Sequence, residues 1–347
     1  MPCATVHLDA AGRVLDRWKE DPSGSPFDAS RADLATAFLQ GSVAPDMGYV
    51  PGVDRFVSDL AHYIRSVDLT RSLVDRAEDP RQEAFAWGWA THVLADILIH
   101  PLVGRACGEL LYGSRELRLN SGADLAAHVG MEVGLDGEIL ISRRGVPAPP
   151  PVPSGAPHEA KLLAEALGRI YDLDWNPRFL EKSQRRAARL NQGWPTALRV
   201  VNGRLEGEVS GGVGVDIPAS GGGLQFGEPP EKSRRGRFQR ITSFAASALG
   251  RFAAPGTPAF GFLRPLRPPR WLVSEVLETL GQFPERFQDL VSGGLTTLEN
   301  HNLESGVPES SGVQHPEALK TQVRLKSVRA GRSPAAGLVA TAAPRIN

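Results

Sequence analysis

Residues 84–104 read AFAWGWATHVLADILIHPLVG, a mostly apolar stretch that nevertheless contains His92, Asp96 and His100. On an α-helix, steps of four residues rotate by about 40°, so these three side chains form one slanting row. Apolar residues cover the other directions, which is typical of a helix that is buried on every side. A buried carboxylate or charged imidazole costs several kcal/mol unless another group compensates it. The row therefore needs partners from elsewhere in the chain.

Length and composition limit the class of protein. The 347 residues suffice for one large domain or two modest ones. Lys plus Arg and Asp plus Glu both number 39, so the net charge of zero gives no general attraction to nucleic acid or an anionic membrane. The two cysteines, Cys3 and Cys107, allow at most one disulfide and exclude a thiolate zinc knuckle.

The first residues, MPCATVHLDAAGRVLDRW, lack the basic and apolar regions of a secretory signal. The apolar run of residues 84–97 is too short and too polar to span a bilayer. We therefore expect a soluble, cytoplasmic protein without a transmembrane segment. The sequence does not indicate an oligomeric state.

Hydrophobic periodicity predicts an all-α fold. Apolar residues recur at helical spacing in residues 6–18, 53–67, 84–100 and 122–140, with a Pro- and Gly-containing loop at 41–52. We expect Pro101 to end or kink the helix that carries the row.

Changes in composition predict four regions. Residues 1–192 would form the helical domain, with a Pro-rich loop at 146–157 inside it. Residues 193–236 would be a Gly-rich linker, and 237–293 a C-terminal helical segment. Residues 294–347 show no periodicity and would be a disordered tail, so the all-α domain would carry a partly disordered C-terminal extension.

The candidate partners of the row also lie before residue 140. His128 and Glu132 are four residues apart in another apolar-rich helix, and Asp46 follows Pro45 in the loop. Nitrogen and carboxylate oxygen without thiolate form the ligand set of catalytic zinc. The candidate metal ligands are His7, Asp46, His62, His92, Asp96, His100, His128 and Glu132, enough for two or three ions if a carboxylate bridges.

Structural explanations compete with this interpretation. A single buried histidine is more often a hydrogen-bonded core residue than a ligand, and a pair four residues apart can be a simple contact. For the row of three on an all-apolar helix, however, ligation is favoured. His158, His301 and His315 lie at a linker edge or in the tail, and we expect them to be solvated. The basic run of residues 231–240 is expected to be a solvated segment and gives no strong signal for nucleic-acid binding.

The order of the candidate ligands resembles that of the bacterial zinc-dependent phospholipase C family, which is related to the S1/P1 nucleases. The stretches that carry the resemblance are MPCATVHL (1–8), GSVAPDMG (41–48), AFAWGWATHVLADILIHP (84–101) and AAHVGMEVG (126–134). The resemblance covers residues 1 to about 140, at most to about 190. In the nuclease branch the last ligand is usually Asp rather than Glu. This chain also lacks the N-terminal Trp through which the secreted phospholipases bind the second zinc.

The resemblance implies an all-helical domain that holds zinc. One ion would be bound by Asp46, His62, His92 and Asp96, a second by Asp96 and His7, and a third by His100, His128 and Glu132. Asp46 would orient the metal-activated water or act as its general base. Tyr49 lies near Asp46 in the sequence and could line a substrate pocket, although ordinary packing explains it better.

Three functions remain open at this stage. The resemblance favours a zinc-dependent phosphoester hydrolase, phospholipase C-like, in which the activated water attacks a phosphodiester such as a phospholipid headgroup. A P1-type nuclease or nucleotidase is the second. The third is a non-catalytic helical scaffold stabilised by metal, although the eight candidate ligands exceed what one closed structural site requires.

Overall fold

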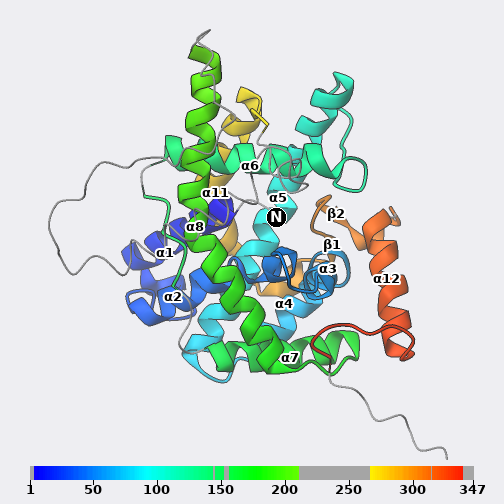
Figure 1. The fold of residues 1–347 in the computed structure, drawn as a ribbon. Coiled ribbons are helices and arrows are strands. Elements are labelled where there is room, and N and C mark those ends of the chain that lie inside the picture. Colours follow the sequence, from blue (N-terminus) through cyan, green and yellow to red (C-terminus); the bar gives the residue numbers. More distant parts are fainter. Residues whose placement is uncertain (1–3, 144, 152–155, 211–265, 314, 339–347) are drawn as a thin grey trace, which may run out of the picture.

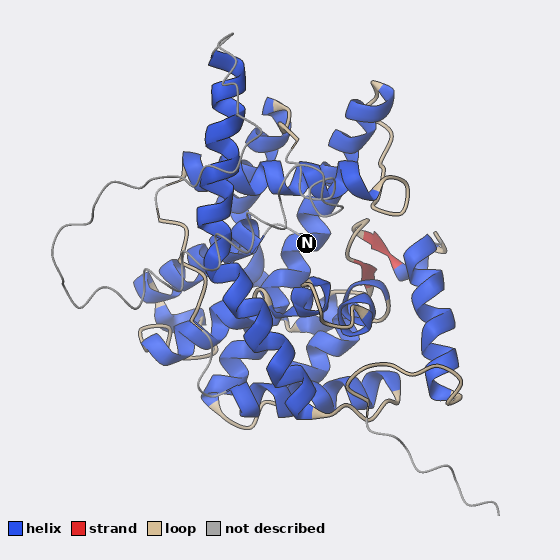
Figure 2. Cartoon of the chain, in the orientation of Figure 1, coloured by secondary structure: helices blue, strands red, loops and turns tan. Residues whose placement is uncertain are grey.

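A computed structural model describes residues 4–143, 145–151, 156–210, 266–313 and 315–338 of the chain. Almost all regular structure in these residues is helical, which confirms the all-α fold class (Figure 2). The exception is a two-residue antiparallel ladder that pairs β1 (His301–Asn302) with β2 (Val307–Pro308). The remaining described elements are, in chain order, α1 (Ala4–Glu20), η1 (Pro22–Gly24), α2 (Ala32–Gly41), η2 (Ala44–Tyr49), α3 (Phe56–Tyr63), α4 (Ser66–Asp75), α5 (Pro80–Tyr112), α6 (Leu125–Ser142), α7 (Ala156–Tyr171), α8 (Pro177–Ser210), α11 (Arg270–Gly293), η3 (Leu295–Thr297), η4 (Glu309–Ser311) and α12 (Pro316–Arg329).

Helix α5 runs through the middle of the molecule (Figure 1). The Asp79 side chain caps its start by accepting from the backbone N–H groups of Arg81 and Gln82, and Pro80 occupies the first helical position. Gly113, with a φ of 71°, ends the helix in the left-handed conformation. Its 33 residues give a length of about 50 Å, and the two larger apolar clusters both include residues of this helix.

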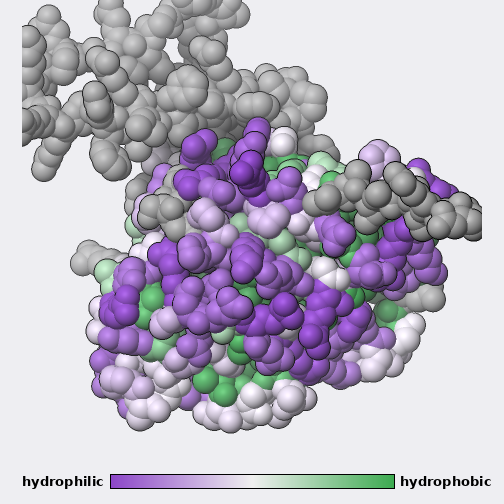
Figure 3. Space-filling view, turned by 90° about the horizontal axis from the view of Figure 1, so that it is seen from below, coloured by the Kyte–Doolittle hydropathy of each residue, from purple (hydrophilic) through white to green (hydrophobic). Residues whose placement is uncertain are grey.

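Two apolar clusters share α5. The first joins it to α1, α2, α6 and α11, with Trp18, Phe38 and Phe287 among its aromatic members. The second joins α5 to η2, α3, α4, α7 and α8. Because the polar row lies on the helix that both clusters surround, it is isolated from bulk water on most sides. The face seen from below in Figure 3 is, by contrast, mainly hydrophilic.

Two glycines let α2 and α5 cross at backbone contact. A Cβ atom on Gly88 would overlap the carbonyl oxygen of Phe38, and one on Gly41 would overlap that of Phe85. Because neither glycine has a side chain, the two helices approach closely, and Ser42 at the end of α2 lies against the row on α5.

Of the two effects expected of Pro101, an end or a kink, the helix shows no end there, because α5 continues to Tyr112. Proline lacks the N–H group that would bond the carbonyl of Ile97 four residues earlier. The turn after β1 packs here, and a Cβ atom on Gly306 would lie 2.7 Å from the Ile97 oxygen and 2.5 Å from Pro101 Cγ. Packing from a distant part of the chain therefore accommodates the proline without breaking the helix.

The regions expected after residue 190 need correction. Helix α8 runs through the boundary that we placed at residue 192 and continues to Ser210 in the predicted linker. Residues 295–313 and 315–338, predicted as part of a disordered tail, instead form η3, the β1–β2 hairpin, η4 and α12. Leu303, Leu325 and Val328 of this segment belong to the second apolar cluster, which holds it in place. Helix α11 lies within the predicted C-terminal helical segment, whereas 237–265 and 339–347 lie outside the described residues.

Among the described residues, no helix combines the length and the hydropathy needed to cross a membrane.

The glycine contact between α2 and α5 gives a stability prediction. Gly88→Ala should lower the free energy of unfolding by about 1–3 kcal/mol, because the added methyl group has no room. Gly281→Ala is the matched control, since it lies inside α11 with nothing within 4 Å of its Cβ position. It should raise the free energy of unfolding by about 0.5–1 kcal/mol through helix propensity alone. Urea unfolding measures both, and equal effects would refute the packing argument.

Candidate metal centre

The three residues of the row lie on α5 as the spacing predicts, and all three are buried. The other five candidates reach the row from four elements. His7 comes from α1, Asp46 from η2, His62 from the last turn of α3, and His128 and Glu132 from α6. The structure brings all eight together in three groups, and within each group one donor atom per residue lies within 4.8 Å of the others. These groups are His7, His92 and Asp96; Asp46, His62 and His92; and His100, His128 and Glu132.

Local contacts explain how the outer elements reach the row. Asp136 of α6 accepts hydrogen bonds from the N–H groups of Thr5 and Val6, both at 3.2 Å, and so fixes the first turn of α1 beside His7. Ser58 of α3 accepts from the N–H of Gly48 at 2.8 Å and also bonds the carbonyl of Pro45. This serine fixes the turn that carries Asp46 to the helix that carries His62.

The two carboxylate oxygens of Asp96 face different imidazoles. Oδ1 lies 3.2 Å from Nε2 of His7, whereas Oδ2 lies 3.2 Å from Nε2 of His92 and 3.5 Å from Nε2 of His62. Asp46 Oδ1 lies 3.2 Å from the same His62 nitrogen. Asp96 can therefore bridge two positions, one beside His7 and the other beside His62 and His92.

Backbone carbonyls determine which way three of the imidazoles point. The Nδ1–H groups of His62, His92 and His100 donate to the carbonyls of Ser58 (2.8 Å), Ser42 (2.9 Å) and Leu303 (2.6 Å), respectively. Carbonyls only accept, so each neutral ring has its lone pair on Nε2, directed at the carboxylates. This is the arrangement of histidines that bind metal.

One contact in the cluster requires a positive charge. The Nε2 atoms of His62 and His92 lie only 3.2 Å apart. With both Nδ1 atoms committed to carbonyls, two neutral rings would place lone pair against lone pair. A cation between them, either a proton or a metal ion, removes this repulsion. The residues present therefore fit a divalent metal.

The third group is held by Glu132. Its Oε1 lies 3.2 Å from Nε2 of His100 and 3.1 Å from Nε2 of His128. Burial alone would lower the pKa of His100, but Asp96 and Glu132 outweigh it and raise that pKa to about 9. Burial would likewise lower the pKa of His128, and Glu132 raises it well above its usual value. Burial opposes ionisation of Glu132 and Asp96, yet the imidazoles around them hold both carboxyl pKa values below their usual range.

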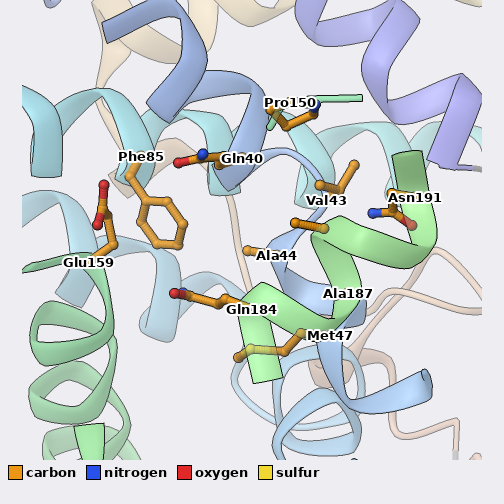
Figure 4. A pocket seen from close by; sticks show the side chains of 11 residues that line it. Gln40, Val43, Ala44, Met47, Phe85, Pro150, Glu159, Gln184, Ala187 and Asn191 are labelled. Carbon is orange, nitrogen blue, oxygen red and sulfur yellow. The ribbon is translucent and has the colours of Figure 1, made fainter. Parts of the chain in front are cut away.

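An open cavity of about 520 Å³ adjoins the cluster. Its lining includes His62, His100, His128 and Glu132 of the cluster, and also Tyr49. A second cavity, of about 30 Å³, lies beside η2 and is lined by Met47, Phe85, Gln184 and their neighbours (Figure 4). The second cavity has room for one or two water molecules only, whereas the first is large enough to hold a small molecule.

The C-terminal segment contributes residues that the sequence did not indicate. Glu304 lines the large cavity, and its carboxylate accepts from the hydroxyl of Tyr63 at 2.8 Å and from the N–H of Ser121. His315, expected to be solvated, is buried with its Nε2 3.5 Å from Glu304. His301 is also buried, contrary to expectation, whereas His158 is exposed as predicted. No periodic pattern marks residues 299–313. Distant contacts hold them instead, such as the bond from Leu303 N–H to the His62 carbonyl and the packing of Gly306 against Pro101.

The pKa shifts predict how pH affects the metal-free protein. Raised imidazole pKa values stabilise the fold below the ordinary histidine pKa of 6.5, and this contribution is lost as the pH rises through about 9. The melting temperature of chelator-treated protein should therefore fall between about pH 6 and about pH 10.

Restored metal should remove most of that fall, because ligation uses the neutral imidazoles. Glu132→Gln should flatten the profile of the metal-free protein, since this carboxylate faces both His100 and His128. His158→Asn is the control and should leave the profile unchanged. A profile of the metal-free wild type that is already flat would refute the assigned ion pairs.

Comparison with known proteins bears on the chemistry of this centre. Residues 6–189 match the family described as zinc-dependent phospholipase C. An uncharacterized protein of Archaeoglobus fulgidus is 25% identical over 96 residues, which are 27% of this chain and 27% of that protein. No solved structure matches the chain. The family match covers more than half of the 347 residues and includes all eight clustered side chains. The chain belongs to the zinc-dependent phospholipase C family.

Proposed function

We propose that this protein is a zinc-dependent phosphoester hydrolase whose substrate is the phosphodiester of a phospholipid headgroup. The observation that carries the proposal is the buried convergence of five imidazoles and three carboxylates beside an open cavity. A closed structural site would need about four ligands and no access, whereas this centre has more ligands and a route for substrate. The cavity thus favours catalysis over the scaffold alternative.

The geometry suggests which residues hold each ion. Asp46, His62 and His92 would hold one zinc together with Asp96 Oδ2, and His7 would hold a second with Asp96 Oδ1. His100, His128 and Glu132 would hold a third. Bound zinc would supply Lewis acidity toward the phosphoryl oxygens and lower the pKa of a water molecule.

The chain's own residues would position the substrate and move the proton. Asp46 is the most exposed of the three carboxylates, with 13% of its side chain accessible against 2% for Asp96 and 3% for Glu132. It can therefore orient the attacking water and accept its proton. Tyr49 lines the cavity, and its ring would border the space for the headgroup. The Arg55 guanidinium lies 5.8 Å from the centroid of that ring.

A basic groove supports a second candidate, hydrolysis of single-stranded nucleic acid. Four cations of α8 line a groove of about 500 Å³, which shares Gly52 and Val53 with the metal cavity. They are Lys182, Arg185, Arg186 and Arg189. Spacings of three and four residues place them on one face of the helix, a pattern that we missed in the sequence. Such a groove could hold the phosphates that flank a cleaved diester.

Turnover of matched substrates tests the proposal. Zinc-loaded protein should hydrolyse a short-chain phosphatidylcholine to phosphocholine and diacylglycerol faster than it cleaves single-stranded oligonucleotides. Faster cleavage of the oligonucleotides by the wild type, together with loss of that cleavage in Arg186→Glu, would establish the nuclease instead. Hydrolysis of neither substrate by fully loaded protein would favour the scaffold.

The proposed role of Asp46 as general base is tested by substitution. Asp46→Asn should lower kcat by about 10²–10⁴-fold, because an amide cannot accept the proton of the water. Asp75→Asn, at an exposed position on α4, is the control and should retain wild-type kcat. The zinc content of both variants is measured alongside. Full activity of Asp46→Asn with full zinc would exclude Asp46 as the base.

Glu304 should support the centre from the C-terminal segment. Its carboxylate holds Tyr63 and Ser121, and the adjacent Leu303 carbonyl orients His100. Glu304→Ala should therefore weaken zinc binding by about 10–100-fold. Titration against a chelator of known affinity measures this loss. Glu299→Ala, at an exposed position of the same segment, is the control and should bind zinc like the wild type. Equal zinc affinities in the wild type and both variants would contradict the supporting role of Glu304.

A further inference from the structure

An exposed apolar hairpin stands beside the metal cavity. It consists of the last turn of α5 and the chain that returns from it, residues 110–118 (Figure 1). Leu110, Leu111, Tyr112 and Leu117 are 50%, 42%, 68% and 45% exposed. Consecutive helical positions point about 100° apart, so the first three residues present apolar surface around the helix end. Four large exposed apolar side chains in one short hairpin indicate an interaction surface.

The hairpin is held in shape by the glycines of α5. The returning chain lies so close to the helix that a Cβ atom on Gly108 would overlap the carbonyl oxygen of Leu117. Leu119 N–H donates to the carbonyl of Gly104 at 3.0 Å. On the other side, Arg115 pairs with Glu109 at 2.9 Å and stacks on Trp271 with its guanidinium 4.7 Å from the ring centroid. The apolar side chains are therefore presented on a fixed framework.

The same segment leads directly to the cavity. After Leu119 the chain passes Ser121, whose N–H bonds Glu304, and reaches Leu125 at the start of α6. Ser121 and Leu125 both line the cavity, and Leu125 is itself 43% exposed. An apolar surface bound by the hairpin would thus meet the mouth of the cavity.

We infer that residues 110–118 dock onto the surface of a phospholipid membrane and bring headgroups to the cavity, an inference that rests on the proposed lipid substrate. Exposed leucines around a tyrosine suit the boundary between headgroups and acyl chains. The hairpin carries two basic and one acidic residue, and Glu109 already pairs with Arg115. Docking is therefore apolar rather than electrostatic, and its occupant is a zwitterionic lipid surface.

Flotation with phosphatidylcholine vesicles tests this docking. The wild type should bind, with little change between low and high salt. A triple variant should weaken binding about tenfold or more, because three leucine side chains are no longer transferred from water into the lipid. It combines Leu110→Ser, Leu111→Ser and Leu117→Ser. The control combines Leu319→Ser and Val323→Ser, which are exposed apolar positions on α12, and should bind like the wild type.

Activity on a monomeric, water-soluble phosphodiester separates this inference from the proposed function. The triple variant should keep the wild-type kcat/KM on that substrate and lose activity on vesicles. Vesicle binding through the hairpin without any hydrolysis would leave the docking intact and refute the hydrolase.

Three results would overturn the docking. They are equal vesicle binding by the wild type and the triple variant, no binding by the wild type, and a wild-type dimer that the triple variant converts to monomer. The last result would identify a second copy of the chain as the occupant.

Discussion

The fold depends on compensating the charge of one buried carboxylate, that of Asp96 at the centre of the longest interior helix. An isolated carboxylate at this depth would cost several kcal/mol, so the surrounding elements must supply positive charge. His7, His62, His92 and His100 all lie within 3.7 Å of its oxygens. The raised pKa of His100 supplies part of that charge in the metal-free protein, but the 3.2 Å approach of the Nε2 atoms of His62 and His92 adds a repulsion. A metal ion resolves both difficulties with the same residues.

The same requirement explains why distant segments converge on α5. Asp136 fixes the start of α1 by accepting two backbone hydrogen bonds, and Ser58 connects η2 to α3. Gly88 lets α2 pack against α5 at backbone contact. The C-terminal segment adds the Leu303 carbonyl and Glu304 from beyond the region matched by the family. Parts of the chain some 200 residues apart thus define one cavity, and a shared core makes the centre and the fold interdependent.

The helical class and the eight clustered residues could be predicted from the sequence, because helical periodicity and the spacing of polar residues within apolar stretches are local properties. His92, Asp96 and His100 share a face through their spacing alone. His7, Asp46 and His62 carry little signal singly, and the order of the ligands in the family resemblance supported them. Residues 299–315 could not be predicted in the same way, since Glu304 and His315 owe their burial to contacts with Tyr63 and Ser121. The continuation of α5 past Pro101 could not be predicted for a related reason, because the turn at Gly306 packs against Ile97 and Pro101. The basic face of α8 was present in the sequence and would have been found by testing helical spacing.

The metal content of the purified protein decides whether the buried cluster binds zinc. Inductively coupled plasma mass spectrometry should be applied to protein prepared without a chelator or a metal-affinity tag. We expect about two to three zinc ions per chain, since eight ligands with a bridging carboxylate fill that many sites. A folded protein that binds no metal, even after incubation with zinc, would contradict this expectation. The cluster would then be a network of protonated imidazoles and carboxylates.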